Sequence, residues 1–231
     1  MGCGPQSTSC GQLSVLMTAG ACIEAWEAHA KGPDGAQAVP LCRAEAFDAL
    51  FPACACEAHS FAGKASPLLG DDQLARIMTT PGTFNETTKE IIWPKLVRVY
   101  TDGISCFRPG CTEGQLLAAI KQLMEGGAEP QVLYGAAVLT VGDVRGAGDP
   151  DRWFCVHDTE ADEFSEHADI IGTRPDAPSK TKLKEIQSSR IRNLRDRMGT
   201  KIVQATDPMD LIVQLRAGGF SVLQDPAPAE V

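Results

Sequence analysis

The longest apolar run of the chain, Gln131 to Val141, extends over only eleven residues. A helix that crosses a bilayer needs about 20 such residues, so the sequence predicts no transmembrane helix. The run alternates and is rich in Val, Leu and Tyr, as strands with one buried face are. Because a single strand is not stable alone, the chain has to build a sheet around it. The composition, 43% hydrophobic and 22% charged, is that of a globular protein.

Two further segments, on either side of an acidic stretch, have the composition of short strands. Trp153–Val156 and Ala168–Ile171 are rich in β-branched and aromatic residues. With 131–141 they predict a small three-stranded antiparallel sheet. The pattern then predicts a βαβ-like end, made of a strand at 201–204, a helix at 207–216 and a strand at 220–223.

Helix signals dominate the N-terminal half. Apolar residues at helical spacing predict a helix over 12–30 and, over 41–59, a helix that Pro52 interrupts and a second short turn. Two more helices are predicted, one over 71–79 and another that begins at Asn85. N-cap residues predict helices over 113–124 and 180–198. The predicted fold is therefore α+β, with a helical N-terminal half, a small antiparallel sheet, a C-terminal basic helix and the βαβ-like end. We expect a helical segment over 1–65, an α+β domain over 66–224 and a disordered tail over 225–231.

All nine cysteines precede residue 156, and their number is odd. Disulfide frameworks are typical of short secreted chains, whereas this chain is long and lacks the basic residues that open an export signal. These features predict reduced thiols and a cytoplasmic location. Cys54 and Cys56, near His59, are spaced more tightly than a usual zinc pair, which favours structural cysteines.

Charge is segregated along the second half of the chain. Residues 131–178, here called the acidic block, carry ten acidic and three basic side chains, a net charge of −7. Residues 179–201 carry eight basic and two acidic ones, a net charge of +6. The two segments can neutralise each other within the fold, or each can serve an external ligand. The total of −9 argues against broad coating of a nucleic acid.

The acidic block holds two of the four histidines within eleven residues. If the flanking segments form a hairpin, imidazoles and carboxylates can converge as ligands of zinc or manganese. The predicted ligands of a metal-dependent hydrolase are His157, Asp158, His167 and Asp169, with Glu160 or Glu166 as its general base. The alternative is an acidic solvated loop, since no known ligand spacing is matched.

Cys155 is a second candidate catalytic residue. It stands two residues before His157, and residues i and i+2 of a strand share a face. A thiol beside an imidazole can act as a nucleophile, which predicts a thiol-dependent enzyme. The alternative is packing, because Cys155 lies between Phe154 and Val156.

The basic helix predicted over 180–198 carries seven cations, namely Lys180, Lys182, Lys184, Arg190, Arg192, Arg195 and Arg197. They suit an acidic protein or a phosphate-bearing ligand, nucleic acid included, because Lys and Arg neutralise phosphates whatever the base sequence. The alternative is a solvated face balanced by the acidic block. Dinucleotide-binding, P-loop, nucleophile-elbow and zinc-protease motifs are absent. The sequence thus predicts a binding module that acts through this helix, with the hydrolase as the alternative.

Overall fold

The computed structural model describes residues 18–23, 52–60, 67–126, 129–148, 151–161 and 164–225. Residues 19–23 of the first predicted helix are helical, and Pro52–Ala58 at the end of the second forms a 3₁₀ helix, η1. Residues 12–17, 24–30 and 41–51 of the predicted segments lie outside the described residues, and the predicted domain division stays a prediction. Within the described ranges, no helix is long and apolar enough to cross a membrane.

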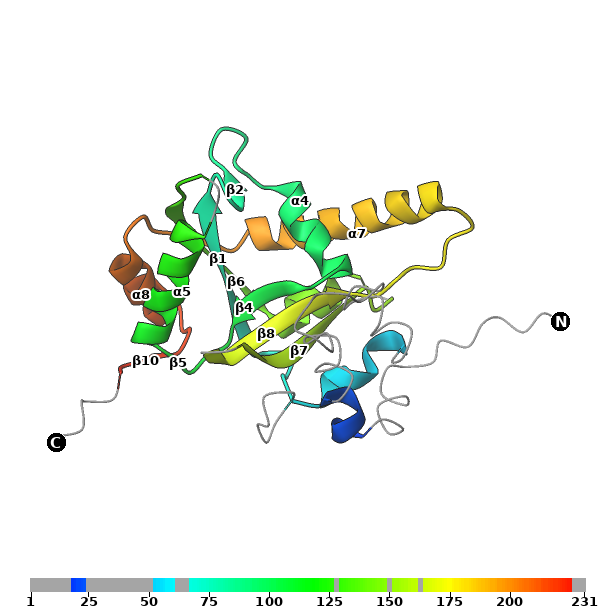
Figure 1. The fold of residues 1–231 in the computed structure, drawn as a ribbon, viewed down its shortest axis with the longest axis horizontal. Helices are drawn as coiled ribbons and strands as arrows, with labels where there is room; N and C mark the ends of the chain where they lie inside the picture. The colour runs from blue at the N-terminus through cyan, green and yellow to red at the C-terminus, as the bar shows by residue number, and fades with distance from the viewer. Residues whose placement is uncertain are drawn as a thin grey trace, which may run out of the picture.

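An antiparallel sheet of six strands forms the centre of the structure, in the order β7-β8-β4-β1-β6-β9 (Figure 1). Its strands are β1 (Gln73–Thr80), β4 (Ile104–Phe107), β6 (Val132–Thr140), β7 (Phe154–Ala161), β8 (Phe164–Gly172) and β9 (Ile202–Gln204). Two small sheets accompany it, one of β2 (Phe84–Asn85) with β3 (Glu90–Ile91), the other of β5 (Cys111–Thr112) with β10 (Val222–Leu223).

Helices cover both faces of the large sheet, which therefore separates two cores (Figure 1). One core lies beneath α4 (Trp93–Leu96), η2 (Val97–Tyr100), α6 (Val141–Gly146) and α7 (Lys180–Gly199). The other lies beneath α5 (Glu113–Glu125) and α8 (Pro208–Ala217). Successive strand residues enter opposite cores, as Leu74 and Ala75 of β1 do.

The predicted α+β fold with a helical N-terminal half is wrong. The architecture is mixed α/β, because helices and strands alternate along the described chain and the sheet has six strands. An interior strand, β1, comes from the half predicted to be helical. The βαβ-like end is also wrong, since β9 pairs antiparallel with β6 whereas β10 pairs with β5 in a separate sheet.

Burial on both faces explains the error at β1, where the pattern over 71–79 predicts a helix. Five of the eight residues of β1 are fully buried and the other three partly so, which leaves no alternation of apolar and polar residues. Periodicity cannot distinguish such a strand from a buried helix. The helix predicted from Asn85 is replaced by the β2–β3 hairpin.

The helices predicted from N-cap residues are confirmed. Thr112 begins α5 in a capping box, in which its side chain accepts from Gln115 N at 3.2 Å and the Gln115 side chain accepts from Thr112 N at 2.9 Å. Ser179 begins α7 by accepting from Lys182 N. The strands predicted at 131–141, 153–156 and 168–171 correspond to β6, β7 and β8, but the predicted sheet of these three is wrong, because β4 and β1 lie between β8 and β6.

Two disulfides correct the expectation of reduced thiols. Cys22–Cys56 joins residues 19–23 to η1, with the two Cα atoms 5.7 Å apart. Cys54–Cys155 joins η1 to β7, with the two Cα atoms 5.4 Å apart. The two disulfides therefore link N-terminal residues to an edge strand of the large sheet.

Candidate functional site

Helix α7 has an anchored half and a projecting half. The fully buried residues Ile191, Leu194 and Met198 all lie in its C-terminal half. In the N-terminal half, Leu183 and Ile186 are only partly buried. Figure 1 shows this half extending beyond the sheet. The first half of the helix thus contributes little to the core.

Three of the seven predicted binding cations hold α7 to the rest of the protein. Arg190 donates to Thr173 O at 3.0 Å and Arg197 donates to Gly146 O at 2.8 Å, while Arg195 forms an ion pair with Glu90 at 3.6 Å. Arg190 also lies over the Trp153 ring, 5.2 Å from its centre. These three arginines therefore have a structural role, because they attach α7 to the rest of the protein.

The other four cations of α7 are exposed. Lys182 pairs with Glu185 at 3.1 Å, but both side chains are more than half exposed, so the pair is weak. The side chains of Lys180, Lys184 and Arg192 make no ion pair or hydrogen bond with any other described residue. Residues four apart on a helix are neighbours on its surface, so these three lie on one inclined row along the helix, which spans about 18 Å. We call Lys180, Lys184 and Arg192 the cationic flank.

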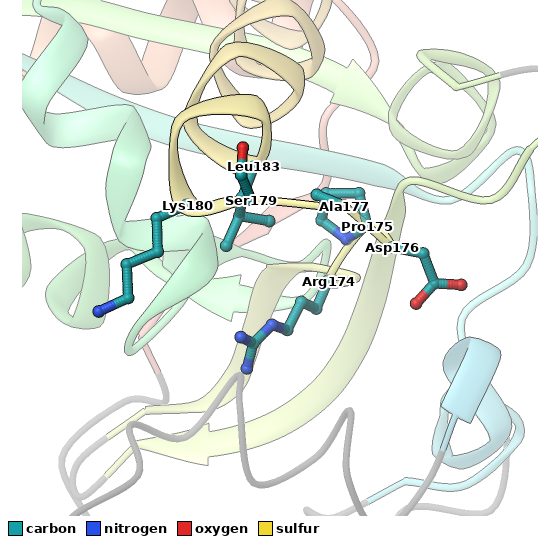
Figure 2. Close-up of a pocket in the computed structure, with 7 residues that line it drawn as sticks. All are labelled: Arg174, Pro175, Asp176, Ala177, Ser179, Lys180 and Leu183. Atoms are coloured by element: carbon teal, nitrogen blue, oxygen red, sulfur yellow. The ribbon is translucent and has the colours of Figure 1, made fainter.

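An open groove of 470 Å³ runs along the cationic flank, and Thr181, Glu185 and Ser188 also line it. A second hollow, of 340 Å³, lies where the chain enters α7 and is lined in part by Arg174 and Lys180 (Figure 2). In Figure 2 these two side chains point to one side of the entering chain, whereas Asp176 points to the other. This hollow at the start of the helix is therefore lined by two cations and one carboxylate.

The acidic block does not neutralise α7 in the part of the chain that the structure describes. Asp143 pairs with Lys201, after the helix, at 3.0 Å. Asp158 pairs with Arg108, which follows β4. No ion pair among these residues joins a carboxylate of the acidic block to a cation of 180–197. This arrangement favours an external ligand over internal charge balance.

Three of the four predicted metal ligands share a face of the β7–β8 pair. His157 stands opposite Asp169 in the register, and His167 lies two residues before Asp169 on β8. Asp158 is adjacent to His157 and therefore points to the other face. The structure thus brings together His157, His167 and Asp169, but not Asp158.

A threonine hydroxyl connects His167 to Asp169. Thr159 Oγ1 lies 2.7 Å from His167 Nδ1 and donates to Asp169 Oδ2 at 3.0 Å. The direct distance from His167 Nδ1 to Asp169 Oδ2 is 3.7 Å. Ser105 Oγ donates to the second oxygen of Asp169 at 3.3 Å. Within the described ranges, no group of three His, Cys, Asp or Glu side chains is arranged to hold a metal ion.

The remaining predicted catalytic residues do not join this network. Glu166 is adjacent to His167 on β8, so its side chain points to the other face. The side chain of Glu160 lies outside the described part of the structure. Cys155 is bonded to Cys54 and has no free thiol in this state.

A buried carboxylate beside β7 is missing from the sequence prediction. Glu57 accepts hydrogen bonds from Arg145, Arg152 and the backbone N–H of Val156. These partners lie 88 to 99 residues away, so no local motif marks them. The one available signal is that Arg145 and Arg152 are two of only three cations in the acidic block.

Comparison with known proteins assigns no relative to this chain. No family model matches the sequence, and neither a curated protein nor a solved structure matches it. The function has to be inferred from the side chains themselves.

Proposed function

We propose that the protein is a binding module that contacts an acidic or phosphate-bearing partner through the cationic flank of α7. One observation carries the proposal. The three cations of the flank bond no other described residue, whereas the arginines at 190, 195 and 197 are all used within the fold. A cation without an internal partner is available to an external anion.

The shape of the flank supports an extended polyanion as partner. Its cations stand on a helix that is already ordered, so binding loses little conformational entropy. Lys and Arg neutralise phosphates independently of sequence, and nucleic acids and phosphorylated proteins both belong to this class. The net charge of −9 argues against broad coating of the surface by a polyanion, so we expect a local contact at the cationic flank.

Polyphosphate and polyglutamate are suitable first probes, because they separate phosphate from carboxylate recognition. The test compares wild type with a variant that combines Lys180→Ala, Lys184→Ala and Arg192→Ala. We expect the variant to lose most of its affinity for at least one polymer. The slope of log Kd against log salt concentration should fall by about one for each phosphate contact removed.

The matched control is Lys121→Ala, compared with Lys184→Ala alone. Both lysines are exposed on helices, but Lys121 lies on α5, at the other face of the sheet. We expect Lys121→Ala to bind as wild type does. Equal affinity of the triple variant and wild type would exclude the cationic flank as the contact.

A metal-dependent hydrolase is the second candidate. His157, His167 and Asp169 share a face, which supports it, whereas Asp158 points away and no three such side chains in the described ranges are arranged to hold a metal ion. Elemental analysis of the purified protein, beside His157→Ala and His167→Ala, tests it. Near-stoichiometric zinc or manganese that is lost in both variants is the result this candidate requires, and metal-free wild type contradicts it.

The cytoplasmic location inferred from the sequence stays a prediction. Disulfides are rare in the cytosol and persist in oxidising compartments, so the two disulfides favour an oxidising one. Alkylation of free thiols in freshly lysed cells of the source, followed by mass spectrometry, distinguishes the cytoplasm from an oxidising compartment. Alkylated Cys54 and Cys155 would support the cytoplasm.

A further inference from the structure

Glu57 lies in a cradle of hydrogen-bond donors from other segments. Its Oε1 accepts from Arg145 Nε at 2.9 Å and from Val156 N at 2.7 Å, and its Oε2 accepts from Arg152 Nη2. The Glu57 side chain is 5% exposed, whereas those of Arg145 and Arg152 are 23% and 27% exposed. The carboxylate is therefore buried beneath two guanidinium groups that still reach solvent.

The cradle holds more positive charge and more donors than one carboxylate uses. Two guanidinium groups face a single negative charge, and Arg152 Nε is buried with no acceptor among the described residues. A dianion with several acceptor oxygens fits these donors better than a carboxylate does.

The occupant of the cradle belongs to a short segment that is latched to β7. The latch is the Cys54–Cys155 disulfide, and beyond η1 the backbone of Ser60 forms a parallel bridge with Asp158. Cys54 has a φ of 61°, in the left-handed region that favours glycine. The latch therefore secures a conformation that the backbone of Cys54 disfavours.

We propose that Arg145, Arg152 and the N–H of Val156 form a binding site for a phosphate group, which Glu57 occupies as an internal ligand until reduction of the Cys54–Cys155 disulfide releases η1. The ligand is inorganic phosphate or a phosphate monoester, since guanidinium groups bind phosphate oxygens in pairs and the dianion balances both arginines. The site shares no residue with the cationic flank, so it does not depend on the function proposed for α7.

Opening the latch uses one dithiol as reductant. A thiolate of the dithiol attacks Cys54 Sγ, the bond to Cys155 breaks, and Cys155 leaves as a thiolate that takes up a proton. The second thiol then attacks the mixed disulfide and releases Cys54, which is also protonated. The dithiol is oxidised to a disulfide, and its two electrons and two protons end on Cys54 and Cys155.

Calorimetric titration with inorganic phosphate tests the site in the full chain. Glu57→Ala removes the internal ligand, and Glu113→Ala is the control, because it removes a carboxylate that pairs with Arg216 at 3.0 Å near the surface. We expect Glu57→Ala to bind phosphate at least about tenfold more tightly than wild type or the control. Adding Arg152→Met should abolish that gain. Equal phosphate binding by Glu57→Ala and Glu113→Ala would overturn the site.

The disulfide provides a second measurement, which decides the proposal even if Glu57→Ala does not fold. Cys54→Ser combined with Cys155→Ser removes the latch, and Cys22→Ser combined with Cys56→Ser removes only the other disulfide. We expect the latch-free protein, and wild type treated with a dithiol, to bind phosphate about tenfold more tightly than oxidised wild type. The control pair should bind as oxidised wild type does. A latch-free protein with no gain in affinity would overturn the release of Glu57 by reduction.

Discussion

Arg108 and Asp158 form an ion pair that bridges strand β8, with the Asp158 side chain only 1% exposed. Asp158 stands opposite Ala168 of β8, and Arg108 follows β4 on the other side of that strand. Ser60 also donates to Asp158. Because an unpaired charge is costly in a buried position, the arginine makes this carboxylate compatible with the fold.

Removal of this arginine should be strongly destabilising. We expect Arg108→Met to lower the free energy of unfolding by about 3 to 5 kcal/mol, since it leaves Asp158 buried without its cation. Urea denaturation at pH 7 measures the change. Arg98→Met is the control, because the Arg98–Asp102 pair is more than half exposed at both side chains. It should cost less than about 1 kcal/mol, and a similar cost for both variants would contradict the role of Arg108.

The burial of His157 predicts a dependence of stability on pH. Its pKa falls from the ordinary 6.5 to about 3 in the folded protein, first because of burial and then because of Arg145 and Arg152. The unfolded chain therefore takes up the proton first, so this contribution is complete above about pH 6.5 and is lost as the pH falls toward 3. When the pH falls from 7 to 5, the free energy of unfolding therefore loses about 2 kcal/mol through His157.

Comparison of wild type with His157→Gln isolates this contribution. We expect the variant to lose about 2 kcal/mol less stability than wild type between pH 7 and pH 5, because it has no imidazole to protonate. Denaturant titrations at both pH values provide the measurement, and titrations at pH 7 and pH 8 should show no such difference. An equal loss in both proteins at pH 5 would mean that His157 is not kept neutral by the fold.

The elements that sequence analysis predicts are those whose signals are local. Thr112 and Ser179 begin their helices because an N-cap acts on the next three residues. Strand β1 has no such signal, since its burial depends on helices that are distant in sequence and lie on both faces of the sheet. The disulfide between Cys54 and Cys155 spans 101 residues, and an odd number of cysteines does not reveal which of them pair.

The same distinction between local and tertiary signals applies to the candidate site. The sequence predicts a basic helix with seven cations, but not that Arg190 contacts Thr173 and Trp153. Strand alternation predicts that His157 and Cys155 share a face, and the hairpin register adds Asp169. The hydrogen bonds of Glu57 cannot be predicted from the sequence, because their donors come from three separate positions in the tertiary fold.

Gly135 should be irreplaceable where β6 pairs with β9. Its φ is 146°, and a Cβ atom at this position would lie 2.0 Å from Val203 O, a backbone atom that cannot move without breaking the strand pair. We expect Gly135→Ala to destabilise the protein by about 3 kcal/mol, as measured by urea denaturation. Gly199→Ala is the control, because nothing lies within 4 Å of its Cβ position. Equal free energies of unfolding for the two alanine variants would contradict the close approach of Val203 O in β9 to Gly135 in β6.

The division of α7 into an anchored and a projecting half can be measured with two leucines. Leu194 is fully buried, whereas Leu183 in the projecting half is only partly so. We expect Leu194→Ala to cost about 2 to 5 kcal/mol of unfolding free energy and Leu183→Ala less than about 1 kcal/mol. Urea denaturation provides both values, and circular dichroism shows whether the helix stays formed. A large cost at Leu183 would mean that the first half of α7 is packed against the protein, which would leave its cationic flank less accessible to a partner.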